Sequence, residues 1–265
     1  MKINLFFVIF IVLISNVNLA SLEILKSKSH YEHTGELTPL IISLSSEDKK
    51  EKIKGVDIIC VVDVSGSMAG EPLNLVKESL KTLVNLMNEQ DNFALISFSS
   101  SAYLLSNLIQ MTSTNKNKIL AIINNLEVIG GTNIYSGLQE GLELITDDYS
   151  SGKKIASMIL LSDGYSSYRD VDNFKILLNS TQKADYIFTL HTVGYGESHD
   201  TTLMHDLSLV KDGGYFYIKR LSMVQDVFLE IYGSLSTVNE VNITLMIQSN
   251  YEINTLNILN YINLL

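Results

Sequence analysis

The sequence predicts an α/β fold built on a mostly parallel sheet, and three observations support this prediction. Apolar runs of strand length alternate along the chain with segments whose apolar residues recur at helical spacing. The runs are apolar throughout, as in strands that are covered on both faces. Strands that alternate with helices in this way are joined by right-handed crossovers and lie parallel. Residues 54–235 are therefore expected to form one α/β domain.

Six segments in this body are predicted as strands. One of them, AYLLSNLIQ, follows the second apolar run after only three serines. Such a short connection favours a hairpin, so this segment is predicted to be an antiparallel edge strand. In chain order, the predicted strands cover residues 56–62, 93–98, 102–110, 155–163, 186–194 and 214–218.

Helices are predicted between these strands from the spacing of their apolar residues. The first carries Leu73, Val76 and Leu80 on one stripe, and Pro72 suits its first turn. The other predicted helices cover residues 115–126, 134–145, 171–179, 201–210 and 222–235.

Two segments outside the body alternate apolar and polar residues, as half-buried strands do. They are Leu37–Ser46 and Glu240–Ser249, and they flank the domain on both sides. We expect them to pair with each other. They lie in an N-terminal β segment, residues 21–53, and a C-terminal β segment, residues 236–265.

Residues 1–20 have the layout of a secretory signal peptide. Lys2 precedes an apolar core, Ile3–Ile14, and a polar exit follows. The alternative is an uncleaved membrane anchor, although this core is shorter than the roughly 20 residues that span a bilayer. Two N-x-S/T triplets, at Asn179 and Asn242, are typical of a glycoprotein that follows the secretory route. We therefore expect a secreted or cell-surface protein, with a membrane-anchored or intracellular protein as the alternative.

Composition argues against several classes of function. The net charge is −10 and no run of basic residues exceeds a pair, which disfavours nucleic-acid binding. The single cysteine, Cys60, permits no internal disulfide and is expected to be a buried, inert thiol. No P-loop is present, and the glycines of TVGYGES lack the third glycine of a dinucleotide-binding loop. The five histidines do not occur at zinc-binding spacing.

Polar residues that follow the buried strands define a candidate site. The first strand ends in Asp63, and the loop DVSGS then presents Ser65 and Ser67 at alternate positions. Asp163 ends another buried strand in the sequence LSDG, and GGTNIYSG presents Thr132 just before a helix. Because ligands bind at the carboxyl edge of open parallel sheets, we expect these two carboxylates and three hydroxyls to converge there.

A set of ligands made only of oxygen suits a hard cation, Mg²⁺ first, with Ca²⁺ or Mn²⁺ as alternatives. Neutral hydroxyls quench the charge of the ion less than further carboxylates would, so the metal keeps the capacity to attract one more anionic oxygen. Each motif alone also fits a structural role, either as a helix cap or as an ordinary turn. All three motifs together, each after the right element, favour the metal site.

With these motifs, the chain resembles a von Willebrand factor type A (vWA) domain with a complete metal-ion-dependent adhesion site (MIDAS). The resemblance runs from Val56 to Leu235 and includes D-x-S-x-S from Asp63 to Ser67, Thr132 and Asp163. The sequences DVSGSMAG, LISFSSSA, GGTNIYSGL and ILLSDG are similar to the branch with RING-linked members and inter-alpha-trypsin-inhibitor heavy-chain-like proteins. A single cysteine cannot build a zinc RING, so ubiquitin-ligase activity is not expected.

The resemblance implies a doubly wound, Rossmann-like sheet of six strands, mostly parallel with one antiparallel edge strand and with helices on both faces. It implies that Ser65, Ser67 and Thr132 coordinate Mg²⁺ directly, and that Asp63 and Asp163 bind it directly or through water. An Asp or Glu of a partner protein would complete the metal's shell. A β-sandwich flanks the domain in this branch, so the C-terminal β segment is interpreted as the start of a truncated sandwich.

The favoured function is a non-enzymatic, metal-dependent protein-binding module of the adhesion type. One alternative is an intracellular vWA scaffold, if the leader is not a signal. The other is a Mg²⁺-dependent phosphohydrolase with Asp63 as nucleophile. Such enzymes usually carry a second Asp two residues later as general acid, where this chain has Ser65. Contact with a membrane is expected only if the N-terminal segment stays as an uncleaved anchor.

Overall fold

The structure is a computed structural model that describes residues 55–149, 156–167, 169–196 and 199–236. It also gives four strands outside this body: β1 (Val8–Leu13), β2 (Ser21–Lys26), β3 (Leu40–Ser45) and β10 (Ile243–Gln248). Packing divides the chain into two compact units, one of residues 52–238 and one of residues 1–51 with 239–265.

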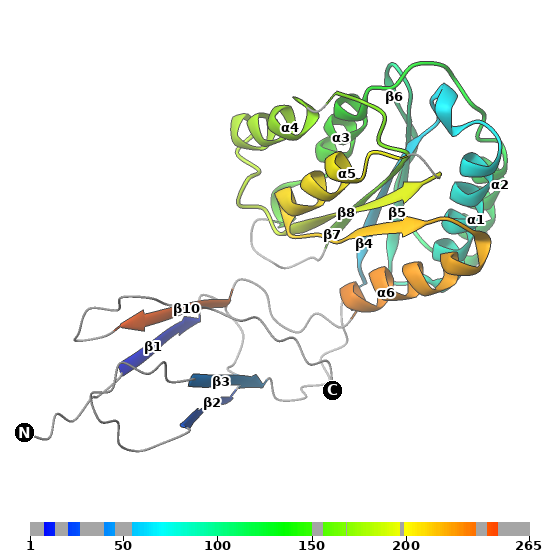
Figure 1. Cartoon of the computed structure of the whole chain (residues 1–265). Coiled ribbons are helices and arrows are strands. Elements are labelled where there is room, and N and C mark those ends of the chain that lie inside the picture. The colour runs from blue at the N-terminus through cyan, green and yellow to red at the C-terminus, as the bar shows by residue number, and fades with distance from the viewer. Residues whose placement is uncertain are drawn as a thin grey trace, which may run out of the picture. The chain divides into compact units, whose positions relative to one another are not determined.

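The larger unit is built on a six-stranded sheet with the strand order β6-β5-β4-β7-β8-β9 (Figure 1). Neighbouring strands are parallel except β5 and β6, which form an antiparallel pair at one edge. This arrangement confirms the predicted fold class, including the edge strand. The strands are β4 (Asp57–Asp63), β5 (Asn92–Phe98), β6 (Ala102–Gln110), β7 (Ala156–Ser162), β8 (Phe188–Tyr195) and β9 (Tyr215–Ile218).

Helices cover both faces of this sheet, three on each (Figure 1). One face carries α1 (Glu71–Leu86), α2 (Ser113–Asn124) and α6 (Val224–Ser236). The other carries α3 (Ile134–Glu143), α4 (Arg169–Ser180) and α5 (Thr201–Ser208). Short 3₁₀ turns lie between these elements: η1 (Gly66–Met68), η2 (Asp147–Tyr149), η3 (Leu209–Lys211) and η4 (Leu221–Met223).

Burial on both faces of the sheet explains the unbroken apolar run of the central strand β4. Ile58, Cys60 and Val62 belong to the core under α1, α2 and α6, whereas Ile59 and Val61 belong to the core under α3, α4 and α5. All five side chains are completely buried. A strand covered on both faces has no position left for a polar residue until it reaches the edge of the sheet. Cys60 is thus the buried thiol that the sequence predicted, and burial raises its pKa well above the usual range.

Helix α3 lies close to the sheet because two glycines face it. A Cβ on Gly137 would lie 2.7 Å from Cδ1 of Phe98 and 2.8 Å from Cγ1 of Val61. A Cβ on Gly141 would lie 2.9 Å from the terminal methyl of Met158. This close approach sets the position of the start of α3, which directly follows the loop that carries Thr132.

Carboxylates at the amino edge of the sheet are held by neutral donors. Asp57 accepts hydrogen bonds from the Asn92 amide and the Tyr149 hydroxyl, each at 2.6 Å. Asp91 accepts bonds from two backbone N–H groups and, at 2.7 Å, from the hydroxyl of Tyr232. These acids have clear structural roles, because they tie the start of the sheet to the helices.

The outer strands do not pair as the sequence suggested. β3 pairs antiparallel with β2, and β10 pairs antiparallel with β1. The expected pairing of Leu37–Ser46 with Glu240–Ser249 is therefore wrong. Alternating residues specify a strand and its buried face, but a short strand of this kind does not specify its partner. The partner of β10 also lies in the segment that reads as a signal peptide. Among the described helices, none is both long and apolar enough to cross a bilayer.

Replacement of Leu80 tests the core assignment. Leu80 on α1 is fully buried, so Leu80→Ala should lower the free energy of unfolding by about 2–5 kcal/mol through lost burial and a residual cavity. Leu221→Ala is the matched control, because Leu221 is 59% exposed and its loss should cost no more than about 0.5 kcal/mol. Urea denaturation of both variants measures the difference, and equal effects would contradict the assignment.

Candidate metal centre

The sheet brings two aspartates together at its carboxyl edge. β4 and β7 are neighbouring parallel strands, and Val62 of β4 is paired with Leu161 of β7. The chain therefore leaves the two strands side by side, through Asp63 at the end of β4 and through Asp163 just after β7. Asp63 is completely buried and Asp163 is 4% exposed. The structure thus places both predicted carboxylates at the same edge.

Asp63 is fixed by hydrogen bonds to both of its oxygens. Oδ1 accepts the backbone N–H of Ser65 at 2.8 Å, and Oδ2 accepts the hydroxyl of Ser162 at 2.5 Å. The Ser162 oxygen also accepts the backbone N–H of Gly164 at 2.8 Å. Ser162 therefore links the two aspartate loops, a role that sequence reasoning missed. The available signal was its position, one residue before Asp163 at the end of a buried strand.

Burial raises the pKa of Asp63 to about 6, above the usual range of an aspartate. The hydrogen bonds from Ser162 and Ser65 favour the ionised form and oppose this shift, while the nearby charge of Asp163 adds to it. Without a cation, the ionised form of Asp63 is therefore costly. A bound cation would reverse this balance, because it stabilises the charged carboxylate.

The loop after Asp63 brings two hydroxyls together through a 3₁₀ turn. The Oγ atoms of Ser65 and Ser67 lie 3.1 Å apart, with Ser65 buried and Ser67 exposed. Gly66 does not adopt a left-handed conformation, so the backbone of this turn does not require glycine there. That conformation belongs to Gly70, with φ +85°. Met68, the last residue of this turn, is completely buried.

The loop that carries Thr132 is fastened beside the loop of Asp63. The N–H of Ile129 donates to the carbonyl of Val64 at 2.6 Å. Gly131 has φ +85°, and a Cβ there would lie 1.9 Å from Oγ of Ser100, so only glycine fits. Thr132 follows and is half-buried. The structure therefore places Thr132 on a loop whose backbone is bonded one residue away from Ser65.

The loop of Asp163 closes the other side of this arrangement. Tyr165 donates its N–H to Oδ1 of Asp163 at 3.3 Å. The hydroxyl of Ser166 donates to Asp170 at 2.6 Å and accepts the N–H of Ile134 at 3.5 Å. Ile134 begins α3, two residues after Thr132. The three predicted motifs are thus connected to one another by hydrogen bonds between their loops.

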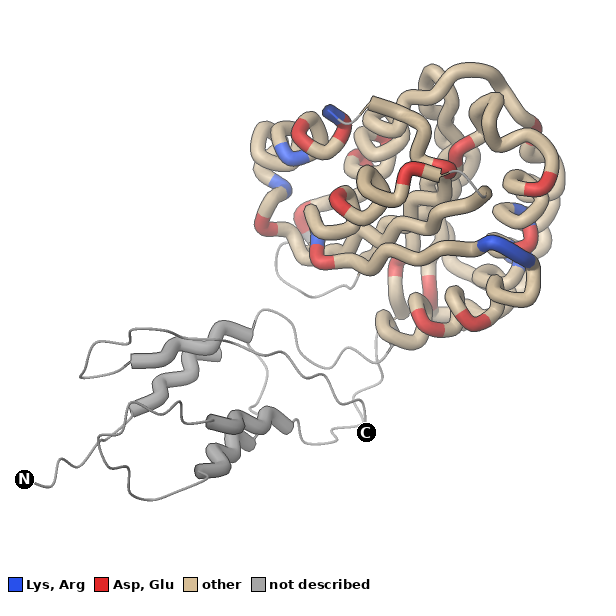
Figure 2. Tube along the Cα trace, viewed as in Figure 1, with Lys and Arg blue, Asp and Glu red and all other residues tan. Residues whose placement is uncertain are grey.

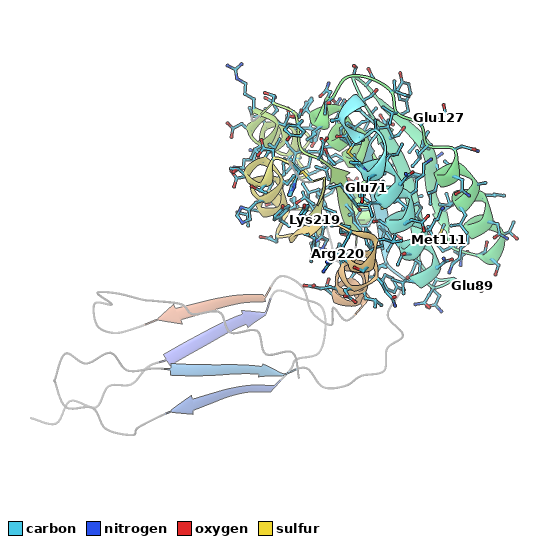
Figure 3. All side chains as sticks on the ribbon, turned by 45° about the vertical axis from the view of Figure 1, so that its right-hand side comes forward. Glu71, Glu89, Met111, Glu127, Lys219 and Arg220 are labelled. Atoms are coloured by element: carbon cyan, nitrogen blue, oxygen red, sulfur yellow. The ribbon has the colours of Figure 1, made fainter. Side chains whose placement is uncertain are left out.

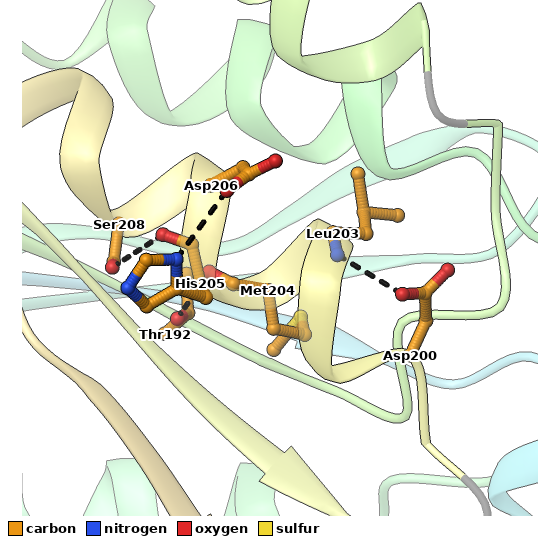
Figure 4. A network of polar contacts seen from close by, with 7 residues as sticks. All are labelled: Thr192, Asp200, Leu203, Met204, His205, Asp206 and Ser208. Carbon is orange, nitrogen blue, oxygen red and sulfur yellow. Dashed lines mark hydrogen bonds and ion pairs between the residues drawn. The ribbon is translucent and has the colours of Figure 1, made fainter.

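A further acid, Asp200, lies beside the site but has a structural role. Its N–H donates to the carbonyl of Asp163 at 2.9 Å, and its Oδ1 accepts the N–H of Leu203 at 3.0 Å, which caps α5 (Figure 4). The hydroxyl of Thr192 in β8 donates to the carbonyl of Met204 at 2.8 Å and holds the same helix against the sheet. Asp200 is therefore an N-cap that supports the Asp163 loop.

In the part of the chain that the structure describes, no basic side chain pairs with the two aspartates of the site. Among the described residues, neither Asp63 nor Asp163 forms an ion pair with a lysine, arginine or histidine. Figure 2 shows acidic positions spread over the domain, and Lys219 and Arg220 lie at the turn before α6 (Figure 3).

Buried carboxylates are expensive unless they are paired or bind a metal. The described residues also contain no cluster of three His, Cys, Asp or Glu that could hold an ion. A cation here would therefore rely on the hydroxyls, and the oxygen-only donor set fits a hard divalent ion.

Comparison with known proteins identifies the class of domain that these residues form. Residues 57–230 match the von Willebrand factor type A domain. The chain belongs to the von Willebrand factor type A domain family.

Curated relatives include inter-alpha-trypsin inhibitor heavy chains, in agreement with the resemblance to that branch. Heavy chain H3 of Homo sapiens is 27% identical over 183 residues, which are 67% of this chain and 20% of the relative. The uncharacterized protein YfbK of Escherichia coli (strain K12) is 30% identical over 187 residues, which are 69% of this chain and 32% of the relative. The uncharacterized protein sll0103 of Synechocystis is 26% identical over 211 residues, 79% of this chain and 48% of the relative. The chain therefore spans less than half the length of these relatives.

Solved structures share the fold at low sequence identity. A von Willebrand factor type A protein from Catenulispora acidiphila has a TM-score of 0.61 and 16% identity, over 89% of this chain and 51% of that one. Proximal thread matrix protein 1 from the mussel byssus, solved with a zinc-occupied MIDAS motif, has a TM-score of 0.50 and 20% identity. That match covers 68% of this chain and 46% of the mussel protein. At these identities the likeness establishes the fold alone.

The raised pKa of Asp63 predicts how stability depends on pH. The pKa is about 6 in the folded protein and about 3.9 in an unfolded chain, so the metal-free folded state binds more protons between these values. Wild-type protein should therefore lose about 2 kcal/mol of stability relative to Asp63→Asn as the pH rises from 4 to 7. Urea unfolding of both proteins in EDTA across this range measures the change.

Saturating Mg²⁺ is the control, because a bound cation stabilises the ionised carboxylate of the wild type and should remove its disadvantage at pH 7. If the difference between wild type and Asp63→Asn does not change with pH in EDTA, the carboxylate is not destabilised by burial.

Proposed function

We propose that this chain is a non-enzymatic, metal-dependent protein-binding module, in which a divalent cation at the carboxyl edge binds an acidic residue of a partner protein. The observation that carries this proposal is the pair of buried carboxylates, Asp63 and Asp163, on neighbouring strands without a basic partner among the described residues. A divalent cation would neutralise both charges and explain why they are kept together.

Each residue has a role in this proposal. Ser65, Ser67 and Thr132 supply neutral hydroxyl oxygens, and Asp63 and Asp163 supply the negative charge, either directly or through water. When bound, the cation supplies Lewis acidity that attracts one more anionic oxygen. Mg²⁺ is the first candidate, and Ca²⁺ and Mn²⁺ are alternatives. Zinc belongs in the comparison, because the mussel protein was solved with a zinc-occupied motif.

The hydrogen bonds around Asp63 favour binding over phosphoryl chemistry. The residue in the position of a general acid is Ser65, whose hydroxyl lies 3.1 Å from the hydroxyl of Ser67. Both carboxylate oxygens of Asp63 already accept hydrogen bonds, from Ser65 and Ser162, and the side chain is completely buried. A nucleophile needs an open path to its substrate, which this carboxylate lacks. A role in holding a cation fits the same contacts better.

Substitutions in the loops test the metal site. Thr132→Ala and Asp63→Ala should each weaken Mg²⁺ binding at least tenfold, because each removes an oxygen ligand, while circular dichroism shows a native fold. Thr202→Ala is the control for the threonine, since Thr202 is exposed on α5 and should leave the affinity unchanged. Calorimetric titration with Mg²⁺, Ca²⁺, Mn²⁺ and Zn²⁺ measures the affinities. Unchanged Mg²⁺ affinity in Thr132→Ala would contradict the site.

We propose that the protein is exported and that residues 1–20 are removed. The apolar core Ile3–Ile14 supports this proposal. The strand β1 (Val8–Leu13) lies within this core, however, and pairs with β10. Removal of the leader would leave β10 without this partner, so the two arrangements exclude each other in the mature protein. Mass analysis of protein purified from its native source should give an N-terminus at Ser21. An N-terminus at Met1 would instead support the pairing of β1 with β10.

A further inference from the structure

The loops around the proposed metal site expose apolar side chains. Val128, Ile129 and Tyr165 are 38%, 52% and 51% exposed. The first two lie just before the Thr132 loop, and Tyr165 lies two residues after Asp163. Large apolar side chains with this degree of exposure usually face solvent singly, and a group of them beside a site marks an interaction surface.

The backbone holds these side chains in place. The N–H of Ile129 is bonded to the carbonyl of Val64 at 2.6 Å, next to Ser65. The N–H of Tyr165 is bonded to the carboxylate of Asp163 at 3.3 Å. Ile129 and Tyr165 are therefore each anchored through their own backbone to a loop of the proposed metal site. A partner that reaches the metal must also meet these side chains.

Two glycines leave the surface open at positions where neither packing nor backbone conformation requires glycine. A Cβ added at Gly66 or Gly130 would meet no atom within 4 Å, and neither residue has a left-handed conformation. Gly131 differs, because its φ of +85° and its contact with Ser100 demand glycine. Without a Cβ, glycine leaves room at these two positions for the backbone of a bound partner to approach closely.

The negative charge of the chain limits how many acidic residues a partner can carry. The chain carries a net charge of −10. Glu71 and Glu127 are exposed near the site loops, and Figure 3 shows Glu127 toward the upper end of the domain, away from Glu89 near the amino edge of the sheet. A partner with many acidic residues would be repelled before it reached the metal. A single carboxylate set among apolar residues avoids this repulsion.

We propose that Val128, Ile129, Tyr165 and the open backbone at Gly66 and Gly130 form an apolar rim that selects the partner. The occupant is a protein segment that presents one Asp or Glu with apolar side chains within two positions of it. The carboxylate reaches the metal, and the apolar neighbours pack on Ile129 and Tyr165. This inference rests on the proposed function and adds the specificity of the same site.

A peptide library tests the rim. Phage-displayed random peptides with one fixed Asp are selected on the wild-type domain in Mg²⁺ and eluted with EDTA. Eluted peptides should be enriched in Leu, Ile, Phe or Tyr within two positions of the Asp. Synthetic versions should bind at least tenfold more weakly to Ile129→Ser, Tyr165→Ser and Gly130→Ala, whose Mg²⁺ affinities stay at the wild-type value.

Ile176→Ser is the matched control, because Ile176 on α4 is 64% exposed and lies outside the site loops; it should bind these peptides like the wild type. If EDTA-eluted peptides show no apolar preference, or if the rim variants bind them as well as Ile176→Ser does, the rim is overturned while metal-dependent binding stands. If no peptide binds in a Mg²⁺-dependent way, the proposed function and the rim are both overturned.

Discussion

Two carboxylates buried at the ends of neighbouring parallel strands are the constraint on which the rest of this structure depends. Asp63 and Asp163 lie side by side because β4 and β7 are adjacent and in register. Like charges in a poorly solvated place repel, and burial alone already raises the pKa of Asp63. Two hydrogen-bond donors to Asp63, the N–H of Ser65 and the hydroxyl of Ser162, offset part of this cost, and the proposed cation would offset more of it.

The two edges of the sheet treat their acids in different ways. At the amino edge, Asp91 accepts three hydrogen bonds, including that of the Tyr232 hydroxyl, so neutral donors satisfy its charge. At the carboxyl edge, the side chain of Asp163 accepts one bond, from the N–H of Tyr165 at 3.3 Å, and the neighbouring oxygens are hydroxyls that can turn toward a cation. Burial of an acid is thus no sign of function by itself. Among the described residues, Asp163 combines burial with fewer hydrogen-bond donors than Asp57 and Asp91 have, and this distinguishes it from the acids of the amino edge.

The sheet and the positions of its two carboxyl-edge aspartates could be predicted from the sequence, because apolar runs and the acids that end them are local signals. Apolar runs located the strands of the sheet, and an acid at the end of such a run must emerge at the carboxyl edge. Nothing local fixed the partners of β3 and β10, since an alternating strand can pair with any edge of suitable pattern. The 3₁₀ turn that brings the serines together and buries Met68 could not be predicted either, because it has no distinct signature in DVSGSM. Ser162 was missed because its role appears only when two strands lie side by side.

A second buried titratable group, His191, also affects how the stability of the protein depends on pH. Nδ1 of His191 accepts the N–H of Gly214 at 2.9 Å, Nε2 has no partner among the described residues, and burial lowers the pKa of His191 to about 4. Protonation of His191 therefore costs stability as the pH falls from about 6.5 to 4, while protonation of Asp63 restores stability over much of the same range. In the metal-free protein the two effects oppose each other. A cation bound as proposed would keep Asp63 ionised, so only the cost of His191 would remain, and acid would also compete with the metal for Asp63. The proposed cation would thus make the fold more stable near neutral pH and more sensitive to acid.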